Sequence, residues 1–187
     1  MRKLKLQVQM TIDGFIAGEQ GEMDWLTFNW GEDIKDYVRG LTENVDTILL
    51  GRNLAQGFIP HWTASLNSPT PDEGAETFVH TPKVVFTKTM VESIWDNTTL
   101  AKGELKKEIE ALKSMPGKEM IVYGGGKFVS SLMKERLIDE LHFFINPAII
   151  GKGMPIFKEV EGKQDFTLIG SKAFECGIIV LTYKTNS

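Results

Sequence analysis

Three consecutive glycines, Gly124, Gly125 and Gly126, follow an apolar run at residues 120–123 and precede a helical pattern that starts at Lys127. Glycine has no side chain, so a ligand can approach its backbone and left-handed angles carry little steric penalty. The amides of a first helical turn have no partner inside the helix, and the helix dipole favours an anion there. The triplet therefore predicts a diphosphate site. The alternative is a tight structural turn, because the spacing is neither the GxGxxG nor the Walker pattern.

Two other apolar runs end in residues suited to phosphate. Gly51 and Arg52 follow residues 47–50, and Thr87 and Lys88 follow residues 83–86. Ligands of open α/β sheets gather at the carboxyl ends of parallel strands. If these ends lie beside the glycine turn, Arg52 and Lys88 contact phosphates, and Thr87 offers a hydroxyl to the 2′-phosphate that distinguishes NADPH. Taken singly, each basic residue is better explained as a solvated surface charge, and the shared position after buried strands is what favours a phosphate site.

Asp13, followed by Gly14, ends the first predicted strand and is the candidate catalytic acid. An acid beside a nicotinamide could orient the substrate or protonate the atom next to the hydride acceptor, and partial burial would raise its pKa. The alternative is an aspartate that forms a turn. Asp33 and Asp36 are rival acids, although a solvated helix face explains both.

The remaining composition excludes several classes of protein. The chain has 187 residues, a net charge of −4 and one cysteine, Cys176, so it can form no intrachain disulfide. His61, His80 and His142 have unrelated spacings, so we expect no metal site. Scattered Lys and Arg residues argue against nucleic acid, and no apolar run is long enough to cross a membrane. We expect a cytoplasmic protein with one domain over residues 1–187.

The pattern of apolar residues predicts alternating strands and helices in the first two-thirds of the chain. Predicted strands are residues 3–10, 47–50, 83–86 and 120–123, and predicted helices are residues 32–41, 103–114 and 127–135, with a helix or turn at 52–57. Residues 15–30 are predicted to be a loop lined by aromatic side chains, and residues 60–82 a long surface excursion with a helical turn at 73–79. Three closely spaced strands, residues 139–147, 166–174 and 178–183, end the chain. This order predicts an α/β fold with a mostly parallel central sheet and antiparallel C-terminal strands.

Five segments in this order resemble the dihydrofolate reductase superfamily. They are residues 10–17 (MTIDGFIA), 50–52 (LGR), 85–89 (VFTKT), 122–128 (VYGGGKF) and 137–141 (LIDEL). The closest branch is that of the C-terminal reductase domain of the deaminase-reductases of riboflavin biosynthesis and its stand-alone bacterial homologues. The likeness extends from residue 3 to about residue 184.

The resemblance implies a three-layer α/β/α fold that binds NADPH. Gly124, Gly125 and Gly126 would contact the diphosphate through a turn with a cis peptide between Gly124 and Gly125, and Lys127 and Phe128 would open the helix. Further cofactor contacts would come from Ile16, Ala17, Gly51, Arg52, Thr87 and Lys88. Asp13 would lie on the substrate side, and the chain would form a homodimer.

The implied activity is transfer of a hydride from NADPH to a small carbonyl or imine, as in a 5-amino-6-(5-phosphoribosylamino)uracil reductase. The sequence lacks the helix carboxylate of folate reductases at a secure position, and Asn53 stands where threonine is frequent after Gly-Arg. Two alternatives therefore remain besides dihydrofolate reductase itself. One is a module that binds or senses NADPH without turnover, and the other is a dimeric structural protein with an empty glycine turn.

Overall fold

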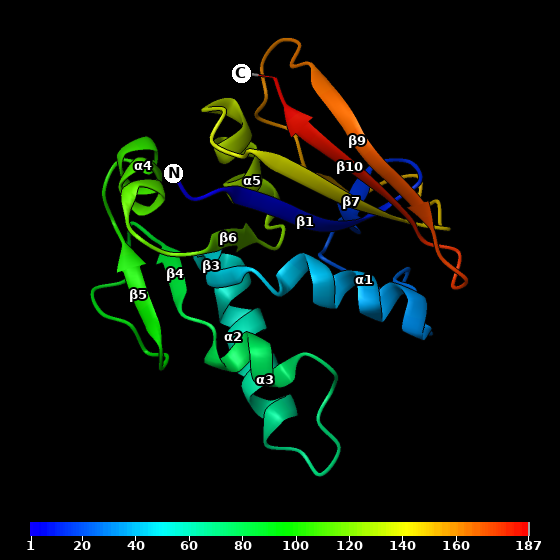
Figure 1. Ribbon diagram of the computed structural model, residues 1–187, viewed down its shortest axis with the longest axis horizontal. Helices are drawn as coiled ribbons and strands as arrows, with labels where there is room; N and C mark the ends of the chain where they lie inside the picture. The colour runs from blue at the N-terminus through cyan, green and yellow to red at the C-terminus, as the bar shows by residue number, and fades with distance from the viewer. Residues whose placement is uncertain (187) are drawn as a thin grey trace.

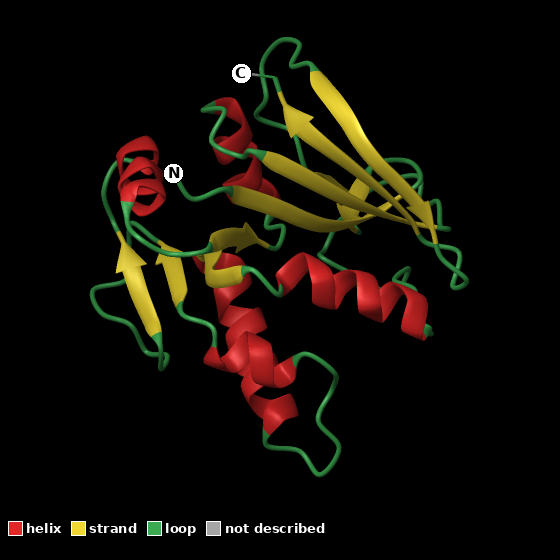
Figure 2. Ribbon diagram, viewed as in Figure 1, coloured by secondary structure: helices red, strands yellow, loops and turns green. Residues whose placement is uncertain are grey.

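A computed structural model describes residues 1–186 and contains one large sheet and one small one. The strands of the large sheet, in spatial order, are β5 (Thr98–Ala101), β4 (Lys83–Phe86), β3 (Val45–Gly51), β6 (Glu119–Val122), β1 (Leu4–Thr11), β7 (Glu140–Asn146), β10 (Ile179–Thr185) and β9 (Phe166–Ala173). The six strands from β5 to β7 are parallel, whereas β10 is antiparallel to β7 and to β9. The predicted fold class is confirmed (Figures 1 and 2).

Helices cover both faces of this sheet. The helices are α1 (Glu32–Thr42), α2 (Arg52–Leu66), α3 (Ala75–His80), α4 (Leu105–Ser114) and α5 (Gly126–Lys134). On one face α4 and α5 bury Ile109, Val129 and Leu132 against alternate residues of the central strands. On the other face α2 packs on β3 and β4, while α1 packs on β7 and β10 (Figure 1). None of these helices is long and apolar enough to span a membrane.

Helix α2 extends further than the sequence predicts. It runs through Pro60 to Leu66, whereas the pattern predicts a helix or turn over 52–57 and a surface excursion from residue 60. Proline inside a helix typically costs about 3 kcal/mol because one backbone hydrogen bond is lost. Aromatic packing offsets that cost, since the ring centroids of Trp62 and Phe78 are 4.3 Å apart and those of Phe58 and Tyr123 are 5.7 Å apart. Pro60 itself is exposed.

Three short strands also differ from the prediction. Strand β5 lies at the edge of the sheet, and β2 (Phe15–Ala17) pairs antiparallel with β8 (Met154–Pro155). The pattern predicts a loop at 15–30, because three residues are too few to show a strand period. Pairing with a segment about 137 residues away, and not local propensity, makes Phe15–Ala17 a strand.

Lys83, the first residue of β4, is buried, with 3% of its surface exposed. Its Nζ donates to the carbonyl oxygens of Val79 and Thr81, both at 2.8 Å. Burial lowers the pKa of Lys83 from 10.5 to about 8. Between these two values the unfolded chain binds a proton that the folded protein does not, so the unfolding free energy rises with pH.

We expect the unfolding free energy of the wild type to rise by about 2 kcal/mol, relative to Lys83→Met, from pH 7 to pH 9.5. Urea unfolding of both proteins at several pH values measures this difference. Other groups that titrate at alkaline pH contribute equally to the unfolding free energy of both proteins, so their contribution cancels in the difference. A constant difference between the two proteins over this range would contradict a lowered pKa of Lys83.

Candidate functional site

The strand ends that carry the candidate residues are neighbours. Strands β4, β3, β6 and β1 are consecutive and parallel in the sheet, so Thr87, Gly51, the glycine turn and Asp13 follow adjacent strands at one edge. The register confirms the expectation that the ends of β4, β3 and β6 lie side by side. Strand β1 instead continues for five residues beyond Leu6, which is opposite Val122, so Asp13 lies further along the sheet. Parallel sheets with helices on both faces place their ligand sites at this edge.

The glycine turn has the backbone that only glycine adopts without strain. Gly124 and Gly125 have φ of 71° and 82°, both in the left-handed region. Gly125 is the N-cap of α5 and offers no side-chain acceptor, so the first amides of the helix remain available to an anion. A Cβ on Gly126 would lie 3.2 Å from Ile16 Cδ1. All peptide bonds of the described residues are trans, so the cis bond implied for Gly124 and Gly125 is absent, and the two positive φ values make the turn instead.

The first turn of α5 also contacts the end of β3. A Cβ on Gly51 would lie 2.9 Å from Phe128 Cβ, and the Phe128 ring packs on Phe86 with centroids 4.8 Å apart. Gly51 therefore allows the helix to approach β3 and β4 closely. Phe128 has a packing function in the structure, while Lys127 beside it is exposed.

The three polar residues predicted to bind phosphates differ in how free they are. The side chain of Arg52 donates a hydrogen bond from Nη2 to Oδ1 of its neighbour Asn53, at 3.1 Å. The Nζ of Lys88 donates to the carbonyl oxygens of Lys102, at 2.8 Å, and Gly103. Thr87 is buried, and its Oγ1 accepts from two backbone amides that follow it, which leaves its own hydrogen to donate. Arg52 is thus the less constrained of the two cations.

Ile16 lies next to the glycine turn because β2 brings it there, and Ala17 follows it in the same strand. Ile16 contacts the core beneath β1, and its Cδ1 covers Gly126. On the partner side, Gly153 lies so close to β2 that a Cβ would overlap the carbonyl oxygen of Ala17. The small sheet therefore depends on glycine at position 153.

Asp13 is exposed, so it lacks the partial burial that would raise its pKa. Its Oδ2 accepts from the Gly151 amide at 2.8 Å and its Oδ1 from the Ile150 amide at 3.4 Å. The hydrogen bond from Thr11, followed by those from Gly151 and Ile150, lowers the pKa of Asp13 below 3.8. The carboxylate is therefore ionised near neutral pH and joins the end of β1 to the loop after β7.

We expect Asp13 to titrate below its ordinary pKa of 3.8, with the midpoint read from its carboxyl carbon by NMR. A carboxylate with a lowered pKa stabilises the folded state at pH values above that pKa, and this contribution is lost when the group is protonated. Asp13→Asn should therefore speed hydrogen exchange at Ile150 and Gly151 at neutral pH, and not at acidic pH. Asp24→Asn, on an exposed loop, is the control. A midpoint near neutrality would instead make Asp13 a proton donor.

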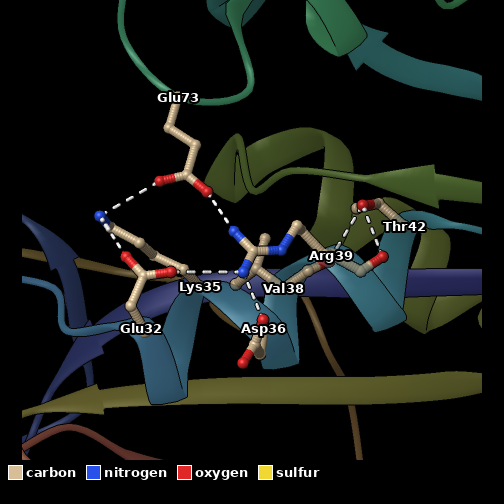
Figure 3. Close-up of polar contacts among 7 residues, drawn as sticks. All are labelled: Glu32, Lys35, Asp36, Val38, Arg39, Thr42 and Glu73. Carbon is tan, nitrogen blue, oxygen red and sulfur yellow. Dashed lines mark hydrogen bonds and ion pairs between the residues drawn. The ribbon is translucent and has the colours of Figure 1, made fainter.

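The rival acids of α1 are engaged elsewhere. Asp33 accepts from the Glu175 amide at 2.9 Å, in the hairpin turn between β9 and β10. Asp36 bonds to Arg39 within an exposed ion cluster that also holds Glu32, Lys35 and Glu73, the last from the segment before α3 (Figure 3). Hydrogen bonds to Lys35 and Arg39 lower the pKa of Glu32. Asp36 thus belongs to a solvated helix face, and the cluster joins that face to residues 67–74.

A polar face on the central strand β1 is the feature that the sequence reasoning missed. Lys5, Gln7 and Thr11 are buried on the side covered by α1 and α2, together with half-buried Gln9. A central strand covered on both faces is usually apolar on both. The polar residues that alternate through residues 3–10 therefore indicated a polar site between β1 and the helices α1 and α2.

The polar face continues onto β7 and α1. Buried His142, opposite Gln7 in the register, lies 2.7 Å from Glu140 through Nε2 and 3.2 Å from the Tyr37 hydroxyl through Nδ1. Burial lowers the pKa of His142, opposed by the Glu140 carboxylate. Trp30 stacks on Phe144 with centroids 6.4 Å apart. Over residues 1–186, no three His, Cys, Asp or Glu side chains gather as a metal site.

This order of strands and helices defines an α/β domain with the dihydrofolate reductase fold. The model of the RibD C-terminal domain matches residues 2–180, so the chain belongs to that family of riboflavin-biosynthesis-type oxidoreductases. It is 29% identical over 191 residues to the uncharacterized protein YyaP of Bacillus subtilis, covering 99% of this chain and 96% of that protein.

Solved structures share this fold. A putative riboflavin biosynthesis protein from Shewanella sp. PV-4 has a TM-score of 0.75 and 25% identity over the full length of both chains. A Thermotoga maritima deaminase and 5-amino-6-(5-phosphoribosylamino)uracil reductase has a TM-score of 0.72 and 18% identity, covering 99% of this chain and 57% of that one. Dihydrofolate reductase from Enterococcus faecalis, complexed with NADP(H), has a TM-score of 0.64 and 16% identity, with 99% and 97% covered.

Proposed function

We propose that the chain, as one domain over residues 1–187, is an NADPH-dependent reductase that transfers a hydride to a small carbonyl or imine. Its activity would resemble that of a 5-amino-6-(5-phosphoribosylamino)uracil reductase. The observation that carries the proposal is the left-handed glycine turn at an uncapped helix, beside the end of β3 and one strand away from the end of β4. The Thermotoga maritima reductase and the Enterococcus faecalis dihydrofolate reductase complexed with NADP(H), which share this fold, support it.

The residues at this edge suit a dinucleotide phosphate. The amides that open α5 would bind the diphosphate, because they are unpaired and lie at the positive end of the helix dipole. Arg52 and Lys127 would neutralise phosphate charge, and the Thr87 hydroxyl would donate to the 2′-phosphate. Lys88 would first have to release the carbonyls that it contacts.

On the substrate side, the backbone of Ile16 and Ala17 would contact the nicotinamide ring. When bound, the nicotinamide supplies the hydride. The lowered pKa of Asp13 suits a carboxylate that accepts hydrogen bonds and orients the substrate, and does not suit a proton donor.

One observation favours a second candidate function, an NADPH-binding module without turnover. The hydrogen bonds that lower the pKa of Asp13 keep it ionised, while Asp33 and Asp36 are engaged with a hairpin and an ion cluster. A reductase that protonates its substrate would then need solvent as the proton source.

Titration with NADPH, followed by tryptophan fluorescence, tests the shared part of both functions. We expect saturable quenching at micromolar NADPH, with weaker binding of NADH. Absence of saturable binding for either nucleotide would reject both. Oxidation of NADPH with ribosylated pyrimidines, dihydrofolate or simple aldehydes then separates a reductase from a binding module.

We further propose a homodimer and a cytoplasmic location, the latter supported by the single cysteine. Strand β9 lies at the edge of the sheet and exposes Leu168 and Ile169, and Ile179 of β10 is also exposed. An apolar edge strand is a common dimer contact. Light scattering after gel filtration should give a mass of two chains, and a monomer at high concentration would reject the dimer.

A further inference from the structure

Asn146, at the end of β7, joins three segments of the polar face. It has no exposed surface. Its Oδ1 accepts from the Thr27 amide at 3.0 Å, and its Nδ2 donates to the Phe144 carbonyl at 3.2 Å and to Gln9 Oε1 at 2.8 Å. Every polar atom of this buried amide is therefore paired.

The backbone partners of Asn146 determine how the Gln9 amide is oriented. The Thr27 N–H can only donate and the Phe144 carbonyl can only accept, so the oxygen and nitrogen of Asn146 cannot exchange places. Because Asn146 presents its NH2 group to Gln9, Gln9 must present its oxygen in return. The Gln9 NH2 group then points away from Asn146, and no hydrogen bond to it is recorded within residues 1–186.

Gln9 lies between the aromatic residues of β7 and the strand that carries the glycine turn. Its register partner on β7 is Phe144, which stacks on Trp30. On the other side of β1, the preceding residue Val8 lies 3.8 Å from where a Cβ on Gly124 would be. Half-buried Gln9 therefore lies on the strand next to the one that carries the glycine turn, with its side chain on the face of the sheet that α1 covers.

Gln7 adds an acceptor on the same face of β1, since alternate residues of a strand share a face. It is 8% exposed, and its buried Oε1 has no hydrogen-bond partner within residues 1–186. A buried acceptor without a hydrogen bond destabilises the folded protein, because it has lost its contact with water. A ligand N–H that reached this oxygen would remove that destabilisation.

We propose that Gln9 and Gln7 determine substrate specificity by binding a ring edge that carries a carbonyl and an N–H group, as in a lactam. Gln9 donates to the carbonyl and Gln7 accepts from the N–H. Asn146 is the positioning residue that turns the Gln9 donor toward the substrate. This inference rests on the proposed function, because it assigns the substrate side of the same site.

The decisive variant is Gln9→Glu, which exchanges one NH2 group for an oxygen at nearly constant shape. One carboxylate oxygen can still accept from Asn146, so the fold should persist, while the other repels a ligand carbonyl. Gln164→Glu is the matched control, because Gln164 donates through Nε2 to the Met133 carbonyl at the far end of α5 and undergoes the same change of charge and donor.

The probe is 2-pyridone, a lactam, titrated with and without NADPH while the side-chain amide resonances of Gln9 and Gln7 are followed by NMR. We expect both pairs of resonances to shift, and Gln9→Glu to weaken 2-pyridone about tenfold. N-methyl-2-pyridone, which lacks the N–H, should bind more weakly and leave Gln7 unmoved. Gln164→Glu should bind 2-pyridone as the wild type does.

Three results would overturn the assignment while leaving NADPH binding, and so the proposed function, intact. They are unmoved glutamine resonances at saturating 2-pyridone, equal affinity of Gln9→Glu and wild type, and displacement of 2-pyridone by NADPH with a shift of the Gln9 amide. The last would place the donor on the nicotinamide carboxamide. If NADPH does not bind, the proposed function is rejected. The titration of 2-pyridone without NADPH still tests whether Gln9 and Gln7 bind a lactam, so the two failures are distinguishable.

Asn146→Asp tests the positioning of Gln9 separately. Its carboxylate can accept from Thr27 but cannot donate, so the Gln9 amide should turn its oxygen toward the ligand. Folded Asn146→Asp, judged by circular dichroism, should then lose 2-pyridone affinity as Gln9→Glu does, with no further loss in the double variant. Additive losses would show that Asn146 does not act through Gln9, as would an unchanged affinity.

Discussion

Replacing Gly125 with valine is expected to reduce NADPH affinity by at least about 100-fold, the equivalent of losing one or two charge-assisted hydrogen bonds. Gly125 has φ of 82° and ψ of 82°, which a β-branched residue does not adopt without strain. Relaxation of that strain would turn the amides of Gly126 and Lys127 away from the diphosphate. Tryptophan fluorescence titration measures the affinity, and circular dichroism verifies the fold.

Gly162→Val is the matched control for the Gly125 variant. Gly162 has φ of 73° and, like Gly151, no heavy atom within 4 Å of a Cβ, but it lies in the segment before β9. The same backbone strain should lower the melting temperature of both variants, and only Gly125→Val should lose NADPH. Unchanged affinity in folded Gly125→Val would show that the glycine turn has only a structural function.

Replacing Gly153 with alanine is expected to lower the unfolding free energy by about 2–3 kcal/mol. The added Cβ would overlap the carbonyl oxygen of Ala17 and lie 3.1 Å from Phe15 Cβ. Backbone atoms cannot move aside as a flexible side chain can, so β2 must separate from β8. Ile16 would then leave Gly126, and NADPH affinity should fall together with stability.

Gly151→Ala provides the comparison for Gly153→Ala. Gly151 has φ of 72° with open space around it, and the variant keeps the amide that Asp13 accepts from. Only the modest cost of a left-handed alanine, about 1 kcal/mol, should appear in urea unfolding. Similar losses of stability in the two variants would contradict the close approach of Gly153 to β2.

Much of the cofactor side of the site was accessible from the sequence. Apolar runs followed by Gly51-Arg52, Thr87-Lys88 and the glycine triplet are local patterns, and local patterns report burial and backbone preference directly. The fold class and the family followed from the order of these patterns and are confirmed. That these residues bind NADPH stays a prediction.

The substrate side was less accessible, because its contacts join distant parts of the chain. Asp13 was predicted to be an acid whose pKa burial would raise, but it is exposed, and hydrogen bonds from Thr11 and from Gly151 and Ile150 lower that pKa. The last two partners lie more than 130 residues away in the sequence. The orientation of Gln9 likewise depends on Asn146, 137 residues further on.

The sequence by itself determined the long apolar strands, the glycine turn after β6 and the polar residues that follow β3 and β4. Only the tertiary structure decided that β4, β3, β6 and β1 are neighbours, that β2 pairs with β8, and that the polar residues of β1 face α1 and α2. The physical reason is that periodicity and backbone preference act between near neighbours in sequence. Hydrogen bonds between strands instead depend on the path of the whole chain.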